Sequence, residues 1–284
     1  MRALLLIPVL LLAGCAAPAP TPDDGVIHIV ASTNVYGDIA AAVGGDQVEV
    51  VSIVDDPAQD PHSVEGSARI QLALSQADIV IMNGGGYDDW MQTMLDGLDH
   101  EPTLINVTVL SGYNAPSDFN EHLWYDFDTI EKLAVELRML VASDGAPLPD
   151  IDFWDRLGDL RTRENVLAEA VLDTGVAITE PVPLYLLTAC GLDNVTPPAF
   201  SEAIEEGTDV PPAALRDTLA LFASGRAALL VYNEQTTSPE TEQVKDAAIA
   251  AGVPVVAVTE TLPPGTHYLD WMSQNLDALE AALK

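Results

Sequence analysis

The sequence predicts an α/β fold of two lobes, each a mainly parallel sheet with flanking helices, joined by one long backbone helix. Short apolar segments alternate with amphipathic stretches over residues 26–148, and a second series of the same kind occupies residues 175–284. Such alternation is typical of strands and helices that build parallel sheets. Between the two series, residues 152–172 keep helical spacing. A helix of about twenty residues spans about 30 Å, which is enough to connect two lobes.

The first series predicts four strands separated by helices. Residues 48–54 are β-branched and apolar, as in a buried strand, and the Gly44-Gly45 pair is a typical helix stop. The predicted strands are residues 26–32, 48–54, 77–83 and 103–107. The predicted helices are residues 35–45, 67–75 and 87–98.

The second series predicts three strands and a closing helix. The strands are residues 175–179, 227–233 and 253–259, and the helix covers residues 268–283. We therefore place an N-terminal lobe at 26–148, a linking helix at 149–174 and a C-terminal lobe at 175–284. Cys190 lies in the apolar segment LYLLTACGL, which predicts a small buried core residue.

The N-terminus predicts export and a lipid anchor. Arg2 precedes an apolar run at 3–13 that is too short to span a bilayer, so residues 1–14 are interpreted as a signal peptide. The segment Leu-Ala-Gly-Cys that ends at Cys15 fits a lipobox, in which Cys15 becomes acylated. The Pro-rich residues 15–25 suit a flexible tether. We expect a lipid-anchored protein at the outer face of the cytoplasmic membrane, without an intramolecular disulfide.

The formal net charge of −33 limits the possible partners. A surface of that sign repels nucleic acid and anionic lipid, and it raises the local concentration of cations. General acidity for solubility or salt tolerance explains the charge equally well, because the acidic residues are scattered along the chain.

Four metal-capable side chains follow predicted strands. Ligands of open α/β sheets bind outside the carboxyl ends of the strands, so side chains at these positions can converge between the lobes. Each alone is weak: a loop histidine is usually solvated or hydrogen-bonded, and a Glu after a strand usually favours a helix N-terminus. Together they form a set of imidazoles and carboxylates suited to zinc, manganese or iron(II). The four residues are His62, His122, Glu180 and Glu260.

Five segments resemble the zinc/manganese solute-binding proteins of ABC transporters. They appear in the same order and cover essentially the whole mature chain. They read DPHSVEGSARIQLALSQADIVIMNGGGYDDWM, NEHLWYD, TEPVPLYLLTACGL, GRAALLVYNEQT and TETLPPGTHYLDWM. The resemblance implies that His62, His122, Glu180 and Glu260 bind Zn²⁺ or Mn²⁺ as the transported ion. It also implies an ABC permease as partner, and we expect a monomer.

Two departures from the family pattern leave the metal open. Zinc-specific members often carry a long His-rich loop, whereas residues 111–121 are short and contain no histidine. The third ligand is frequently His in the family, and Glu180 stands there, as it more often does in manganese-type relatives. His267 is an alternative fourth ligand, but Glu260 is favoured because it directly follows a predicted strand.

Two other functions fit the sequence less well than metal delivery. A zinc enzyme would keep an open coordination position for water, whereas four protein ligands close the site, and no His-Glu-x-x-His motif is present. A metal-binding surface adhesin would need an interaction module, which the sequence does not show. We therefore expect a binding protein and not an enzyme.

Overall fold

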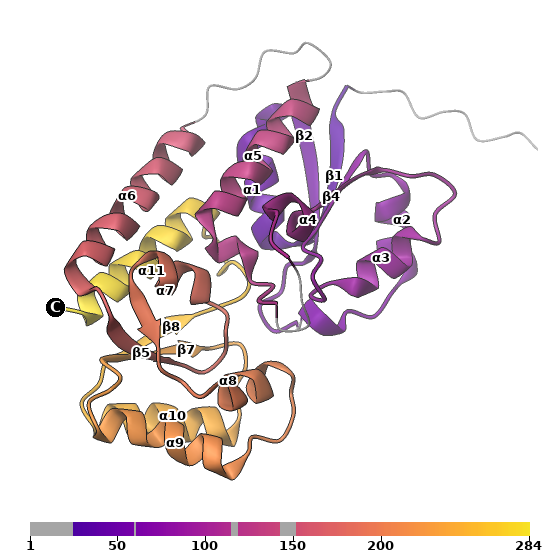
Figure 1. The fold of residues 1–284 in the computed structure, drawn as a ribbon. Helices are drawn as coiled ribbons and strands as arrows, with labels where there is room; N and C mark the ends of the chain where they lie inside the picture. The colour runs from indigo at the N-terminus through magenta and orange to yellow at the C-terminus, as the bar shows by residue number, and fades with distance from the viewer. Residues whose placement is uncertain (1–24, 60, 115–118, 143–151) are drawn as a thin grey trace, which may run out of the picture.

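The computed structural model describes residues 25–59, 61–114, 119–142 and 152–284. It contains two four-stranded sheets in which every pairing is parallel, with strand orders β2-β1-β3-β4 and β6-β5-β7-β8. Helices flank both sheets (Figure 1). The predicted fold class, two α/β lobes of mainly parallel strands, is confirmed.

The first lobe follows the predicted alternation of strands and helices. Its strands are β1 (Ile27–Thr33), β2 (Val48–Val54), β3 (Ile79–Met82) and β4 (Thr103–Asn106). Its helices are α1 (Asn34–Gly44), α2 (Ala68–Ser75), α3 (Asp89–Leu95), α4 (Val107–Ser111) and α5 (Phe127–Val141), with short 3-10 turns η1 (Gly45–Gln47), η2 (Pro61–Ser63) and η3 (Leu123–Tyr125). The predicted strand 103–107 stops at Asn106 because the Asn106 side chain accepts from the backbone N–H of Val109 and caps α4.

The second lobe contains one strand more than the three predicted. Its strands are β5 (Thr174–Ile178), β6 (Leu192–Asn194), β7 (Leu229–Asn233) and β8 (Val255–Val258). Its helices are α7 (Leu184–Ala189), α8 (Pro198–Glu205), α9 (Pro212–Ala223), α10 (Pro239–Ala250) and α11 (Tyr268–Ala282). Strand β6 has only three residues with the sequence Leu-Asp-Asn, so neither apolar alternation nor β-branched residues signal it.

The long helix α6 (Phe153–Val171) contacts elements of both lobes. On one side Arg161 pairs with Asp128 and Glu131 of α5. On the other side Arg163 pairs with Glu280 of α11 at 2.9 Å. Figure 1 shows α6 running alongside α11 and towards α5. The predicted lobe boundaries at 148 and 175 remain predictions.

A continuous hydrophobic core extends through both lobes. At the lobe junction the hydroxyl of Tyr268 donates to the carbonyl of Trp124 at 2.7 Å, and the hydroxyl of Tyr125 donates to the carbonyl of Thr259 at 2.8 Å. Cys190 is fully buried in the same core, as predicted, and burial raises the pKa of its thiol to about 12. The junction is therefore a packed interior.

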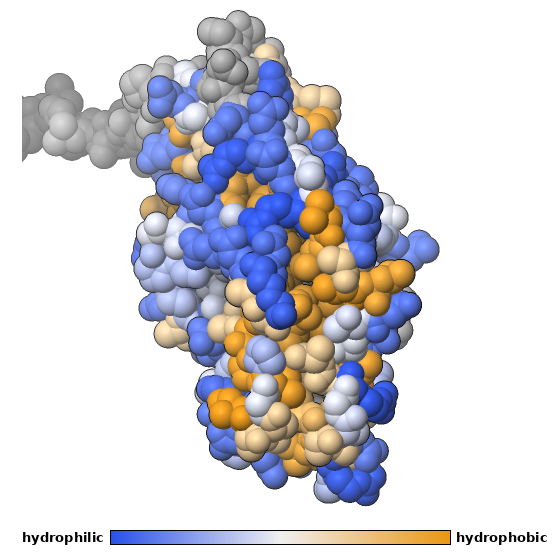
Figure 2. All heavy atoms as spheres, turned by 90° about the vertical axis from the view of Figure 1, so that its left-hand side faces the viewer, coloured by the Kyte–Doolittle hydropathy of each residue, from blue (hydrophilic) through white to orange (hydrophobic). Residues whose placement is uncertain are grey.

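The predicted signal peptide, Cys15 and nearly all of the tether lie outside the described residues. Within the described part of the chain, no helix combines the length and apolar character needed to cross a bilayer. Figure 2 shows the face on the α6 side of the molecule, where hydrophilic residues dominate the upper part and apolar residues gather over the lower centre. The surface is thus not uniformly hydrophilic despite the net charge of −33.

Candidate metal site

The first predicted ligand, His62, lies in η2, shortly after β2 of the first lobe. The turn is anchored because the indole N–H of Trp90 donates to the carbonyl of Pro61 at 3.0 Å. The ring of Tyr87 packs edge-on against the imidazole, with ring centroids 4.6 Å apart. One third of the His62 side chain is exposed, so it is the ligand candidate that solvent reaches most easily.

The loop that carries Tyr87 depends on glycine. Gly84 and Gly85 have φ values of +72° and +69°, and a Cβ at Gly84 would lie 2.4 Å from the Asn106 side chain. Only glycine adopts such backbone without strain in so little space. The buried carboxylate of Asp88 accepts from the backbone N–H of Gly84 at 2.8 Å and fixes the turn.

The second predicted ligand, His122, directly precedes η3 and is fully buried. Its Nδ1 lies 2.7 Å from Oδ1 of Asn120, whose amide is oriented by donation from Nδ2 to the carbonyl of Pro181 at 3.1 Å. Nδ1 is therefore the protonated nitrogen, which leaves the lone pair on Nε2. Burial, and secondarily His62, holds the pKa of His122 well below its usual 6.5.

The Nε2 atom of His122 has no hydrogen-bond partner among the described residues. A buried polar atom without a partner is rare in native proteins, and metal-binding imidazoles commonly have the other ring nitrogen fixed by a hydrogen bond, as Asn120 fixes Nδ1 here. His122 is therefore prepared to bind a metal in its neutral form.

The predicted ligand Glu260 follows β8 by two residues and is buried. Its Oε1 accepts from Nδ2 of Asn233 at 3.0 Å, and its Oε2 lies 3.4 Å from the hydroxyl of Tyr87 and 3.8 Å from Nε2 of His62. A carboxylate of the second lobe thus reaches the histidine of the first.

A residue that the sequence argument missed, Glu205, lies closer to both histidines. Its Oε1 lies 3.5 Å from Nε2 of His122 and 3.7 Å from Nε2 of His62. Glu205 is the last residue of α8. A carboxylate at the C-terminal end of a helix interacts unfavourably with the helix dipole. Two consecutive glutamates there, Glu205 and Glu206, could therefore have indicated a cation-binding site.

Glu180, the remaining predicted ligand, lines the same interlobe cavity as His62 and Glu260. It follows β5 by two residues and is buried, and its Oε2 accepts from Nδ2 of Asn233 at 2.5 Å. The same Nδ2 atom also serves Glu260. Burial is the main reason that the pKa of Glu180 rises to about 8. Glu180 and Glu260 therefore share one amide donor.

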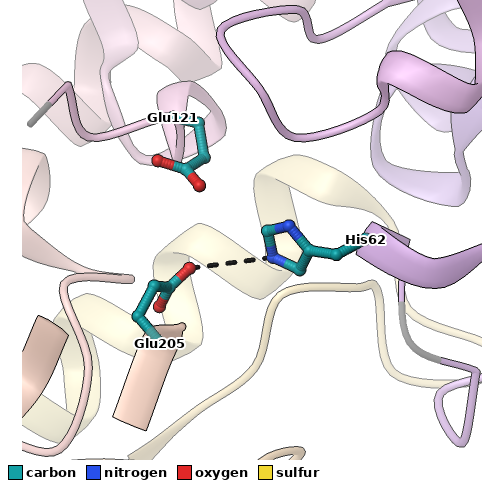
Figure 3. Close-up of side chains that lie close together, drawn as sticks. All are labelled: His62, Glu121 and Glu205. Carbon is teal, nitrogen blue, oxygen red and sulfur yellow. Dashed lines mark ion pairs between the residues drawn. The ribbon is translucent and has the colours of Figure 1, made fainter. Parts of the chain in front are cut away.

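Glu121 completes a compact group with His62 and Glu205. One ligand-type atom of each residue lies within 4.8 Å of the others. In Figure 3 the three side chains approach one another from separate elements, and the dashed line marks the pair of His62 and Glu205. Burial raises the pKa of Glu121. Glu121 directly precedes His122, so it can add charge near the site without belonging to the predicted set.

A cavity of about 330 Å³ between the lobes is lined by His62, Glu180, Glu205 and Glu260, whereas His122 and Glu121 are not among its lining residues. Its wall combines residues of the His62 loop with residues that follow β5, α8, β7 and β8. His267, the alternative fourth ligand, does not line it. His267 lies at the start of α11, and its side chain is 77% exposed. Its Nδ1 lies 2.7 Å from Oδ1 of Asp38.

Comparison with known proteins identifies the family. The family model ZnuA, described as zinc-uptake complex component A, periplasmic, matches residues 29–146 and 152–282. The chain belongs to the ZnuA family. The resemblance to zinc/manganese solute-binding proteins is thereby confirmed, and a family of uptake components agrees with the expectation of a binding protein over an enzyme.

Individual relatives of this ZnuA-family chain are named as metal-binding proteins. The manganese-binding lipoprotein MntA of Halalkalibacterium halodurans is 27% identical over 198 residues, which cover 66% of this chain and 66% of that protein. The manganese ABC transporter substrate-binding lipoprotein PsaA of Streptococcus anginosus is 25% identical over 49% of this chain and 50% of its own length. The chain therefore spans between about half and two thirds of these relatives.

The same fold occurs in solved structures. The periplasmic zinc-binding protein TroA from Treponema pallidum superposes with a TM-score of 0.72 at 16% sequence identity, covering 91% of this chain and 99% of that chain. The two-lobe architecture of this ZnuA-family chain is thus shared over nearly its full described length.

Proposed function

We propose that this protein is the extracytoplasmic substrate-binding subunit of an ABC importer, and that it carries a divalent transition metal ion between its lobes. One observation carries the proposal: the Nε2 atoms of His62 and His122 both face Oε1 of Glu205, at 3.7 and 3.5 Å. Nitrogen and oxygen donors gathered at an interlobe cavity are the donor set that zinc and manganese use in proteins.

We propose His62, His122, Glu205 and Glu260 as the ligands. The sequence resemblance assigned the third place to Glu180, and that assignment stays a prediction. The distances favour Glu205, because its Oε1 lies within 3.7 Å of Nε2 of both imidazoles. In this proposal Asn233 orients Glu260 by donating to its carboxylate, and Glu180 fixes Asn233 because it accepts from the same amide nitrogen.

Four protein ligands argue for carriage over catalysis. A catalytic zinc site keeps one position open for water, while a site closed by four side chains binds and releases the ion. The names of the relatives describe metal-binding lipoproteins and a zinc-uptake component, which do not favour the enzyme or adhesin alternatives.

The two histidines with two carboxylates make a site of mixed hardness. Such a site accepts manganese through its oxygen donors and binds zinc more tightly at equilibrium, as the Irving–Williams order requires. We propose Zn²⁺ or Mn²⁺ as the transported ion.

We further propose that Cys15 carries lipid and holds a monomeric protein at the outer face of the cytoplasmic membrane, where an ABC permease receives the ion. The lipobox supports this proposal, and both relatives above are named as lipoproteins.

The test is metal content by elemental analysis of protein purified from its host, followed by competition titration. We expect one Zn²⁺ or Mn²⁺ per chain in the wild type and none in a His62→Ala, His122→Ala double variant. Binding of the same stoichiometry in the double variant would place the site elsewhere.

A further inference from the structure

Gln235, two residues beyond β7, contacts the loops that carry two proposed ligands. Its Oε1 accepts from the backbone N–H groups of Glu260 at 2.5 Å and Thr261 at 3.0 Å. Its Nε2 donates to Oγ1 of Thr261 at 2.9 Å and to the carbonyl of Pro57 at 2.8 Å. Both ends of one amide are therefore satisfied by two different loops.

The two loops belong to different lobes. Pro57 lies in the first lobe, between β2 and the turn that carries His62. Glu260 and Thr261 lie in the second lobe, after β8. Pro57 and Gln235 also line the cavity of the candidate site. The hydrogen bond from Gln235 to Pro57 thus connects the two lobes at the edge of the cavity.

This bond differs from the contacts that hold the lobe junction together. Tyr268 and Tyr125 bond across the lobes from fully buried positions within the core. Pro57, by contrast, is exposed, and Gln235 is half-buried. Hydrogen bonds at exposed loops open at low free energy, whereas those within a packed core open only with larger unfolding. The Gln235–Pro57 bond can therefore break while the junction stays closed.

Gln235 itself is held in place. Its backbone N–H donates to Oδ1 of Asn233 at 3.1 Å, and Nδ2 of the same Asn233 donates to Glu260. Gln235 is therefore hydrogen-bonded to the same Asn233 that donates to Glu260.

We propose that Gln235 is a positioning residue that clasps the His62 loop to the Glu260 loop and slows release of the bound ion. This proposal rests on the proposed function. Release of an ion bound by ligands of both lobes requires the two loops to separate, so a bond between them opposes the first step. The contribution of one such hydrogen bond corresponds to about a tenfold change in rate.

The decisive variant is Gln235→Glu. One carboxylate oxygen still accepts from the N–H groups of Glu260 and Thr261, and the other can accept from the hydroxyl of Thr261. The donations to Pro57 and to Oγ1 of Thr261 are both lost, because a carboxylate has no N–H group. The contact with Thr261 can re-form in the reverse direction, whereas the carbonyl of Pro57 can only accept, so the bond between the lobes is the one that is not replaced. Gln59→Glu is the matched control: Gln59 lines the same cavity, so the substitution adds the same charge without touching the clasp.

The measurement is the rate of Zn²⁺ release into excess chelator, with melting temperature recorded in parallel. We expect release about tenfold faster from Gln235→Glu than from Gln59→Glu, with similar melting temperatures of the metal-free forms. Equal release rates in the two variants would overturn the clasp, since added negative charge alone slows release of a cation.

Hydrogen exchange in the metal-free protein separates this proposal from the proposed function. We expect residues 55–59 to exchange faster in Gln235→Glu than in Gln59→Glu. That result supports the clasp even if the wild type binds no Zn²⁺, in which case the proposed function fails alone. Unchanged exchange in this segment would contradict the clasp.

Discussion

Nε2 of the fully buried His122 faces Oε1 of Glu205 at 3.5 Å, although the two residues come from different lobes. Asn120 holds the proton of His122 on Nδ1, and burial lowers the pKa of the imidazole. The approaching atoms are therefore the Nε2 lone pair and a carboxyl oxygen, and they repel each other when Glu205 is ionised. A metal ion held between them, as proposed, would remove that repulsion.

The third ligand can be identified by exchanging one carboxylate at a time. Because Glu205 lies near both imidazoles, we expect Glu205→Gln to weaken zinc binding by about a thousandfold or more. Glu180→Gln keeps a hydrogen-bonding side chain next to Asn233 and should weaken zinc binding by roughly tenfold, as is usual for residues that orient a metal ligand. Competition titration of both variants measures the two constants. A larger loss for Glu180→Gln would support the sequence-based assignment of Glu180 as the third ligand and contradict the assignment of Glu205.

Three of the four proposed ligands were predicted from the sequence by one rule. His62 and Glu260 follow strands, and His122 follows the last strand of its sheet, so the topology of parallel sheets places them at one edge. Glu205 was missed because it ends a helix, and helix ends converge on a site only through tertiary packing. The short strand β6 was missed for a related reason: its pairing with β5, and not its own residue pattern, makes it a strand.

The fourth ligand is tested by comparing Glu260 with His267. We expect Glu260→Ala to cut metal affinity by orders of magnitude, because the buried carboxylate lies 3.8 Å from Nε2 of His62. His267→Ala should leave affinity within a few fold, since that side chain is 77% exposed and pairs with Asp38. Isothermal titration measures the metal affinity of both variants. A loss of affinity confined to His267→Ala would contradict the assignment of Glu260 as the fourth ligand.

Glu164 of α6 should make stability depend on pH. It is 7% exposed, and burial is the main reason that its folded-state pKa rises to about 8 from 4.5. A raised pKa means that the folded state binds the proton more tightly, so the contribution is full below about pH 4.5 and is lost as pH rises through 8.

The matching variant, Glu164→Gln, cannot ionise and should remove this loss. We expect it to be more stable than wild type at pH 9 by roughly 2–4 kcal/mol, and to differ little at pH 5. Urea unfolding at the two pH values provides the measurement. The exposed Glu169 on the same helix serves as control through Glu169→Gln, which should show no such pH-dependent difference.

Anchoring depends on Cys15. Acylation of the lipobox cysteine would hold the protein at the membrane, because a lipid anchor adds about 0.8 kcal/mol of membrane affinity per buried CH₂ group. Replacing Cys15 by Ser should release the protein into the medium or periplasm, as followed by fractionation and immunoblotting. Cys190→Ser should not, since the Cys190 thiol is buried in the core. Unchanged membrane fractionation of Cys15→Ser would refute the anchor.

The bound metal should stabilise the fold, and the stabilisation should grow with the logarithm of the ratio of free metal to Kd. A ligand that binds only the folded state adds about 2.7 kcal/mol at a free concentration of 100 times Kd, so the melting temperature should rise with the logarithm of free metal. Zinc should raise it more than manganese at equal free concentration, because imidazole and carboxylate sites follow the Irving–Williams order. Scanning calorimetry in metal buffers measures both series. The His62→Ala, His122→Ala double variant should lose both responses, because the remaining carboxylates bind either ion only weakly. A zinc response that survives in that variant would show that the stabilising ion binds outside the interlobe site.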